Sequence, residues 1–193
     1  MVYRMCFDEE AYLAGYIAAD GHINKKDYTI SIYTGKYESA LMLKGMLAKY
    51  TGRKVGIRQH KRVYEVYVTD KALAIYFHYK YKIPIGYKAD KVKLSNHLNE
   101  CSKRSFIAGF FDGDGSIYMR NYRRKNGRIS TYLEIKIKSK SFEFLSQIKI
   151  FLSSLGIHSR IKSYPGHVSY LVISKSLDSH LFFKCIPTIL KRP

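Results

Sequence analysis

Two nine-residue segments decide the fold of this chain: LAGYIAADG at residues 13–21 and IAGFFDGDG at residues 107–115. They begin 94 positions apart, and each ends in Asp-Gly. Three further pairs of similar segments follow in the same order, so the four pairs together predict an internal duplication of about 90 residues. The further pairs are TGRKVGI (51–57) with LGIHSRI (155–161), TDKAL (69–73) with ISKSL (173–177), and IPIGYK (83–88) with IPTILK (186–191).

Both repeats predict the same order of helices and strands, and we divide the chain into residues 1–97 and residues 98–193. Each repeat begins with a helix that carries the nine-residue motif. Alternating apolar and polar residues then predict strands, because successive side chains in a strand point to opposite faces. The expected order is αββαββα in each repeat, an α+β fold. After the motif helices, the predicted elements are strands over 28–34 and 131–139, helices over 37–50 and 141–156, strand pairs over 55–70 and 158–174, and last helices from Asp70 and Ser176.

The second repeat is longer than the first, since the spacing between matching segments grows from 94 to 103 or 104 residues. The polar, basic segment RNYRRKNGRIS at 120–130 is the expected place of the extra residues. We interpret residues 120–128 as a basic loop that could wrap a nucleic acid as an extra arm. Gly156 is expected at the end of the helix over 141–156, and Pro165-Gly166 is expected to form a turn.

Small residues recur at every fourth position of both motif helices: Ala11, Gly15 and Ala19 in the first, and Ser105, Gly109 and Gly113 in the second. Residues four apart share a helix face, and small side chains let two helix backbones approach closely. We therefore expect the two helices to pack together as the seam between the repeats. Gly21 and Gly115 then end the helices and place Asp20 and Asp114 at neighbouring C-termini. Two carboxylates at the negative ends of helix dipoles are unfavourable unless a divalent cation such as Mg²⁺ binds them.

Charge is the strongest signal in the composition: 34 Lys and Arg residues against 15 acidic residues give a net charge of +19. This charge favours a polyanionic partner, because neutralised phosphates release condensed counterions. A basic protein of the ribosomal kind would share the composition, but it would not explain two equivalent acids. No apolar run is long enough to span a membrane, and the N-terminus does not resemble a signal peptide. We expect no membrane partner and a cytoplasmic location.

The cysteines Cys6, Cys101 and Cys185 are odd in number, widely spaced and without a CxxC pair. This spacing predicts neither a disulfide framework nor a zinc site. We therefore expect a protein of a reducing compartment.

The two motifs resemble those of the LAGLIDADG homing endonucleases, in the single-chain form with two pseudo-symmetric halves, and the resemblance covers nearly the whole chain. It implies two antiparallel sheets that form a saddle over DNA, and Mg²⁺-dependent cleavage of both strands. Mn²⁺ is then expected to substitute, and Ca²⁺ to bind without supporting cleavage. The resemblance assigns the metal ligands to Asp20 and Asp114 and to the backbone carbonyls of Ala19 and Gly113.

The chain departs from the motif at one position: the sixth residue is Asp112 in the second copy and Ala18 in the first. We therefore expect Asp112 to support the site and not to bind the metal. The family tends to place a basic residue near the metals late in each half, and Lys88 and Lys191 match. A lysine there could stabilise charge that develops on the phosphate. The family often places a polar residue that positions water just after the first strand pair, and Lys36 and Lys140 lie there.

The outward faces of the strands are expected to contact bases and phosphates. Arginine can read guanine with two hydrogen bonds, whereas tyrosine, serine and lysine mostly hold phosphates. The candidates in the first repeat are Lys25, Tyr28, Ser31, Arg58, His60, Arg62, Tyr64 and Glu65. Those in the second are Tyr118, Arg120, Arg123, Arg124, Tyr132, Glu134, Lys136, Lys138, Arg160 and Lys162.

Two other functions fit the same fold. An intron maturase would bind intron RNA as a splicing cofactor, and both acids are intact, which argues against a maturase that does not cleave. A DNA-binding regulator that has lost cleavage would not need Asp20 and Asp114. The start at Met and the ending LKRP favour a free-standing, intron-encoded enzyme over one carried in an intein. Because one chain supplies both halves, we expect a monomer on an asymmetric site.

Overall fold

The computed structural model describes residues 6–123, 126–163 and 167–192, and it contains the two predicted αββαββα repeats. None of the described helices is long and apolar enough to cross a membrane. The first repeat comprises α1 (Glu9–Asp20), β1 (Gly21–Ile23), β2 (Thr29–Thr34), α2 (Tyr37–Ala48), β3 (Gly56–His60), β4 (Val63–Thr69) and α3 (Lys71–Tyr81). The second comprises α4 (Glu100–Asp114), β5 (Gly115–Arg123), β6 (Ile129–Ser139), α5 (Phe142–Ser154), β7 (Arg160–Lys162), β8 (Ser169–Ile173) and α6 (Ser176–Cys185).

Each repeat folds its strands into one antiparallel sheet, with the orders β1-β2-β4-β3 and β5-β6-β8-β7. The alternation in β2 buries Ile30 and Ile32 beside Val66 and Val68 of β4, on the face that α2 and α3 cover. The second sheet buries the corresponding apolar residues beneath α5 and α6. The predicted α+β fold class is confirmed. Residues on the other parity of each strand form the uncovered face of the sheet.

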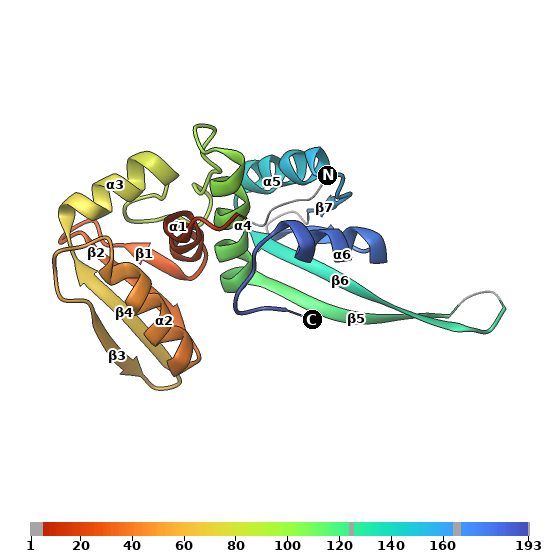
Figure 1. The fold of residues 1–193 in the computed structure, drawn as a ribbon, viewed down its shortest axis with the longest axis horizontal. Coiled ribbons are helices and arrows are strands. Elements are labelled where there is room, and N and C mark those ends of the chain that lie inside the picture. The colour runs from red at the N-terminus through yellow and green to blue at the C-terminus, as the bar shows by residue number, and fades with distance from the viewer. Residues whose placement is uncertain (1–5, 124–125, 164–166, 193) are drawn as a thin grey trace.

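Helices α1 and α4 lie side by side at the centre of the molecule and join the repeats (Figure 1). The small residues are needed at this crossing. A methyl group on Gly15 would lie 2.0 Å from the Phe106 carbonyl oxygen, and one on Gly109 would lie 1.9 Å from the Tyr12 carbonyl oxygen. Such distances do not occur between real atoms, so only glycine permits this backbone approach. The predicted seam is confirmed.

The two helices run in the same direction, because their N-termini meet as well as their C-termini. Asp8 caps α1 by accepting a hydrogen bond from the Ala11 amide, and its other oxygen accepts one from the Ser102 hydroxyl of α4 at 2.6 Å. The Asp8 amide donates to the Ser105 hydroxyl at 2.9 Å. At the other end, Gly21 and Gly115 follow directly after the helices and begin β1 and β5. The seam therefore brings both motif aspartates to one end of the helix pair.

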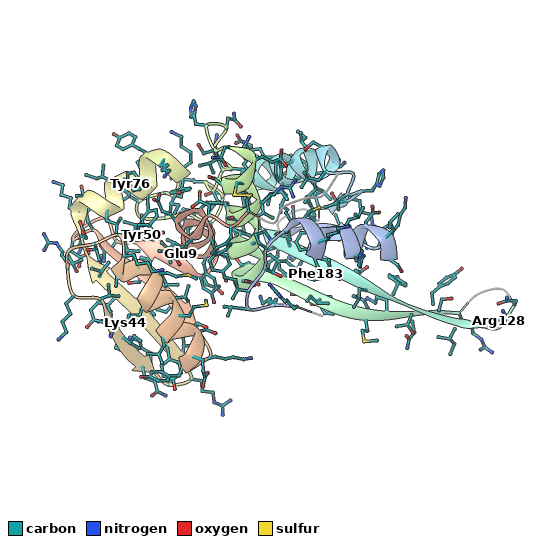
Figure 2. The ribbon with its side chains drawn as sticks, in the orientation of Figure 1. Glu9, Lys44, Tyr50, Tyr76, Arg128 and Phe183 are labelled. Carbon is teal, nitrogen blue, oxygen red and sulfur yellow. A yellow bond between two sulfur atoms is a disulfide. The ribbon has the colours of Figure 1, made fainter. Side chains whose placement is uncertain are left out.

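The extra residues of the second repeat lengthen two strands, so the expected loop over 120–128 is mostly wrong. β5 and β6 pair as far as Arg123 and Ile129, and they continue past α6 as a two-stranded ribbon (Figure 1). Figure 2 shows Arg128 at the outer end of this ribbon and Phe183 of α6 close to its base. Alternation of β-favouring residues on both sides of the turn favours strand pairing here. Gly156 has a φ of +77° just after α5, as predicted for a helix end. The predicted turn at Pro165-Gly166 lies outside the described residues.

Cys6 and Cys101 form a disulfide, so the expectation that the chain has none is wrong. The two residues are 95 positions apart, close to the 94-residue spacing of the motifs. Residues near the pseudo-twofold axis meet their own counterparts from the other repeat, and Cys6 and Cys101 lie at nearly equivalent places beside the ends of α1 and α4. The pairing therefore follows from the duplication, although no cysteine motif in the sequence predicts it.

Reduction of this disulfide is expected to lower the free energy of unfolding by about 3–5 kcal/mol, because the crosslink closes a loop of this length in the unfolded chain. Thermal or denaturant unfolding with and without a phosphine reductant measures the difference. Cys6→Ser should match the reduced protein and should not respond to the reductant. An unchanged midpoint on reduction of the wild-type protein would contradict this prediction.

Candidate active site

Asp20 and Asp114 are the last residues of α1 and α4 and lie beside each other across the seam. A methyl group on Gly113 would lie 2.5 Å from the Ala19 Cβ and 3.4 Å from Asp20 Oδ2, which shows how closely the two helix ends approach. Burial raises the pKa of Asp20, and the neighbouring Asp114 carboxylate raises it further. Each carboxylate also meets the negative end of a helix dipole. Cationic partners would therefore stabilise the two carboxylates of this site.

Two cavities open on either side of the seam, and each combines residues of both repeats. The cavity of about 220 Å³ takes Asp114 from α4, together with Ala19 and Lys88 from the first repeat. The cavity of about 350 Å³ takes Asp20 from α1, together with Gly113 and Lys191 from the second repeat. Each acid therefore faces the helix end of the other repeat. This crossed arrangement makes each cavity depend on the packing of α1 against α4.

The predicted lysines cap the two helix ends. Lys88 Nζ donates to the carbonyl oxygens of Ile17, Ala18 and Ala19 at 3.0, 2.9 and 2.5 Å. Lys191 Nζ donates to the carbonyl oxygens of Phe111, Gly113 and Gly115 at 3.3, 2.6 and 2.7 Å. Cations are favourable at helix C-termini, where the last carbonyls lack partners within the helix.

Both ammonium groups are partly buried beside the acids. Burial lowers the pKa of Lys88 to about 8, against the opposing effect of the Asp114 and Asp20 carboxylates. Burial lowers the pKa of Lys191 as well. The structure thus holds a lysine at each cavity, and its part in the reaction stays a prediction.

A further lysine, Lys138, pairs directly with Asp114: its Nζ lies 3.0 Å from Asp114 Oδ1. This hydrogen bond raises the pKa of Lys138. Sequence reasoning placed Lys138 among the DNA-contacting residues and missed this position. The signal was available in the strand register, since Ile137 pairs with Gly115 as Ile32 pairs with Gly21. Lys138 follows Ile137 and lies beside Asp114, whereas the corresponding residue of the first repeat, Tyr33, stacks on the His22 ring.

Lys36 and Lys140 lie at the rims of the two cavities, one in each. Both are exposed; Lys36 directly precedes α2, and Lys140 lies two residues before α5. Lys36 lines the cavity of Asp20, and Lys140 lines the cavity of Asp114. The structure places them where a water or a phosphate could reach them. Their role in positioning water stays a prediction.

Asp112 is buried at 3% exposure and fixes the segment that carries Lys191. Its Oδ2 accepts hydrogen bonds from the Ile189 and Leu190 amides at 2.7 and 2.9 Å, and its Oδ1 accepts one from the Lys191 amide at 3.0 Å. The Tyr12 hydroxyl of α1 donates to the same carboxylate at 2.7 Å. Asp112 thus positions Lys191, and its counterpart Ala18 cannot do this for Lys88.

Asp112→Asn is expected to slow cleavage of one DNA strand on the order of tenfold to a hundredfold, because a small displacement of a catalytic group is costly. An amide would present a donor to the Lys191 amide and release that end of the segment. Strand-labelled, single-turnover cleavage should therefore accumulate nicked DNA. Tyr12→Phe is the matched control, since it removes one bond to Asp112 but none to the segment. Equal slowing of both strands by Asp112→Asn would show that the residue only supports the fold.

The oxygen atoms of both cavities fit a hard divalent cation that is also bound by oxygens of the substrate. Each cavity contains one motif carboxylate and is lined by Ala19 or Gly113, whose main-chain carbonyl oxygen accepts a hydrogen bond from Lys88 or Lys191. Among the described residues there is no group of three or more His, Cys, Asp or Glu side chains that could hold a metal alone. Mg²⁺ is commonly bound by one or two carboxylates, with phosphate oxygens and water completing its shell. The sparse donor set therefore agrees with metal binding that is completed by DNA.

Eleven predicted DNA contacts lie on the uncovered sheet faces or their turns, with exposed or half-buried side chains. Their lysine and arginine side chains give these faces the positive charge that attracts phosphates, and their tyrosine hydroxyls can hydrogen-bond phosphates. They are Lys25, Arg58, His60, Arg62, Tyr118, Arg120, Tyr132, Lys136, Lys138, Arg160 and Lys162.

Of the seven remaining predicted contacts, six do not lie exposed on these faces. Tyr64 lies on the helix-covered face, where its ring is 5.4 Å from the ring of Tyr37 of α2. Tyr28 packs against the core below Lys71. Arg123 points to the same face of the ribbon as Met119, opposite to the face of Arg120. Arg124 is outside the described residues. The remaining three, Ser31, Glu65 and Glu134, are buried in the sheet faces.

A model of the LAGLIDADG-like domain matches residues 8–80 and 102–187, once in each repeat. The chain belongs to the LAGLIDADG family. Among solved structures, I-DmoI in complex with DNA and Mn has a TM-score of 0.66 at 19% identity, with 96% of this chain and 97% of that chain covered. I-SmaMI bound to an uncleaved DNA target with calcium ions has a TM-score of 0.67 at 14% identity, with 95% and 86% covered.

A curated protein also matches this LAGLIDADG chain: the tRNA-splicing ligase RtcB of Methanocaldococcus jannaschii is 29% identical over 189 residues. The match covers 83% of this chain but 19% of the ligase. The chain thus spans about a fifth of the curated relative that it matches. The likeness concerns that portion and does not extend to the ligase as a whole.

Proposed function

We propose that this chain is a site-specific endonuclease that cuts both strands of a long, asymmetric DNA target. The observation that carries the proposal is the crossed pair of cavities, each with one motif acid, the opposite helix end and a half-buried lysine. Two such centres in one chain suit two phosphodiester bonds on opposite strands. The net charge of +19 and the cationic uncovered faces of the two sheets suit a DNA duplex that lies across both repeats.

The residues of each cavity have separate tasks in this proposal. Asp20 and Asp114, with the carbonyls of Gly113 and Ala19, would hold Mg²⁺ beside the scissile phosphates. The bound ion would polarise the phosphate, favour hydroxide at neutral pH and stabilise the leaving oxygen. Lys191 and Lys88 would donate to phosphate oxygens as their charge grows in the transition state. Lys36 and Lys140 would orient water at the rims.

The cofactor and the assembly follow from the same geometry. We propose that Mn²⁺ replaces Mg²⁺ in cleavage, and that Ca²⁺ supports binding without cleavage. The chain would act as a monomer, because it already contains both halves of the site. The relatives crystallised with DNA and with manganese or calcium ions support this choice of ligands. An origin within an intron and a cytoplasmic location stay proposals.

A cleavage-site selection tests the function directly. The protein is incubated with a randomised duplex library in Mg²⁺, and the cut ends are captured and sequenced. We expect one recurrent sequence, cut at two fixed bonds on opposite strands, and no capture in EDTA. Random ends, or no ends in Mg²⁺ or Mn²⁺, would contradict the proposal. Binding to a structured intron RNA without any DNA cleavage would favour the maturase, which the same cationic faces permit.

A further inference from the structure

Glu65 is a buried acid on the sheet face that the proposed function turns toward DNA. Its side chain is 2% exposed, although it lies on the uncovered parity of β4 between β2 and β3. A carboxylate on a phosphate-binding surface weakens binding unless nearby cations neutralise it. The contacts of Glu65 explain why an acid can lie at this place.

Both Glu65 oxygens are fully engaged by neighbours on the same face. Arg58 donates through Nε to Oε2 at 2.6 Å and through Nη2 to Oε1 at 3.0 Å. His60 Nε2 lies 2.9 Å from Oε2, and the Tyr33 hydroxyl donates to Oε1 at 3.4 Å. Burial by itself would raise the pKa of Glu65, but the hydrogen bonds, that of Arg58 first, lower it to about 2. Glu65 is thus ionised and has no oxygen to offer a base.

The contact with Glu65 fixes Arg58 in one orientation. The two donors that point to Glu65 are on one side of the guanidinium, and the Tyr67 ring lies below its plane, with the centroid 4.7 Å from Cζ. The Arg58 side chain is still 52% exposed. Among the described residues nothing accepts a hydrogen bond from the other edge, which carries Nη1 and the second hydrogen of Nη2 as a pair of parallel donors.

Two parallel donors of this kind match one base edge in the major groove. Guanine presents O6 and N7 side by side as acceptors, and arginine bound to both is the commonest specific contact. A phosphate also accepts a fork of donors, but a phosphate contact needs no buried acid behind the arginine. We infer that Arg58, held by Glu65, reads a guanine in the half of the target bound by the first repeat. This inference rests on the proposed function and adds part of the sequence that the target must contain.

The second repeat has a comparable pair in the ribbon. Arg120 Nε donates to Glu134 Oε1 at 3.1 Å, and the Arg120 Cζ lies 5.4 Å from the centroid of the Tyr118 ring. Glu134 is 5% exposed and also pairs with Lys136. Among the described residues only Glu134 accepts a hydrogen bond from Arg120, so the Nη1 and Nη2 edge has the same ability to read guanine in the other half-site.

Binding selection with substituted proteins tests the inference on Arg58. Wild type, Arg58→Lys and Glu65→Gln each select from a randomised duplex library in Ca²⁺, and the bound sequences are compared position by position. Arg58→Lys keeps the charge but loses the fork of donors. It should reduce the preference for guanine at one position of one half-site by about tenfold or more. Preferences elsewhere and the salt dependence of binding should remain.

Glu65→Gln should reduce the same preference by a smaller factor, because Arg58 remains but is no longer held. Arg53→Lys is the matched control, because Arg53 is an exposed arginine between α2 and β3 that is not among the predicted DNA contacts. That control should select the wild-type sequence. A recurrent wild-type sequence that Arg58→Lys leaves unchanged would overturn the inference and leave the proposed function standing. Failure of the wild-type protein to select any sequence would contradict both.

Discussion

Asp20→Asn and Asp114→Asn are each expected to abolish double-strand cleavage while DNA binding in Ca²⁺ stays largely intact. An amide keeps the size of the side chain but removes the charge that a divalent cation requires. The two acids lie in separate cavities, so neither can replace the other. Cleavage of a labelled target in Mg²⁺ and equilibrium binding in Ca²⁺ measure the two effects.

The matched control for both variants is Asp27→Asn, which changes an exposed acid in the turn before β2. It should cut and bind as the wild type does. Normal double-strand cleavage by either motif variant would refute the assignment of these acids as metal ligands. Loss of binding together with cleavage would instead indicate that the helix seam had been disturbed.

Lys88→Met and Lys191→Met are each expected to slow cleavage on the order of 10²–10³-fold, with a much smaller effect on affinity. A group that stabilises charge developing in the transition state lowers the barrier without tightening ground-state binding. Each lysine belongs to one cavity, so each variant should slow one strand more than the other and accumulate nicked DNA. Single-turnover cleavage of DNA labelled on each strand separates these rates.

The control for the lysines is Lys82→Met, an exposed lysine just beyond α3. A lysine that only holds a phosphate should weaken binding and reduce its salt dependence by about one unit. If Lys88→Met and Lys191→Met behave in this way and cut at the wild-type rate, the two lysines belong to the basic surface. Their helix-capping bonds would then be structural.

The repeat in the sequence predicts the seam and the place of the acids because both depend on local rules. Gly15 and Gly109 recur on one helix face, and their closeness to the other backbone needs no information beyond that spacing. Gly21 and Gly115 follow the helices, so Asp20 and Asp114 must come last. Lys88 and Lys191 were predicted from the family resemblance together with their recurrence in both repeats.

Other features depend on how distant segments meet, which no local pattern specifies. Asp112 holds residues 189–191 across a separation of 77–79 positions. Cys6 meets Cys101 only because α1 and α4 run in the same direction, which brings their N-termini together. The alternation along β4 predicted that Glu65 faces outward, and Glu65 does lie on the uncovered face of the sheet. Its burial comes from the side chains of Arg58 and His60, which cover it.

The central claim is that one chain carries two complete and different cleavage centres. Active-site titration tests it most directly: a known amount of protein is mixed with excess selected target in Mg²⁺, and the first turnover is measured beside sedimentation of the complex in Ca²⁺. We expect one chain per duplex, and one duplex cut in both strands for each chain. Two chains per duplex, or one linearised duplex for every two chains, would contradict it.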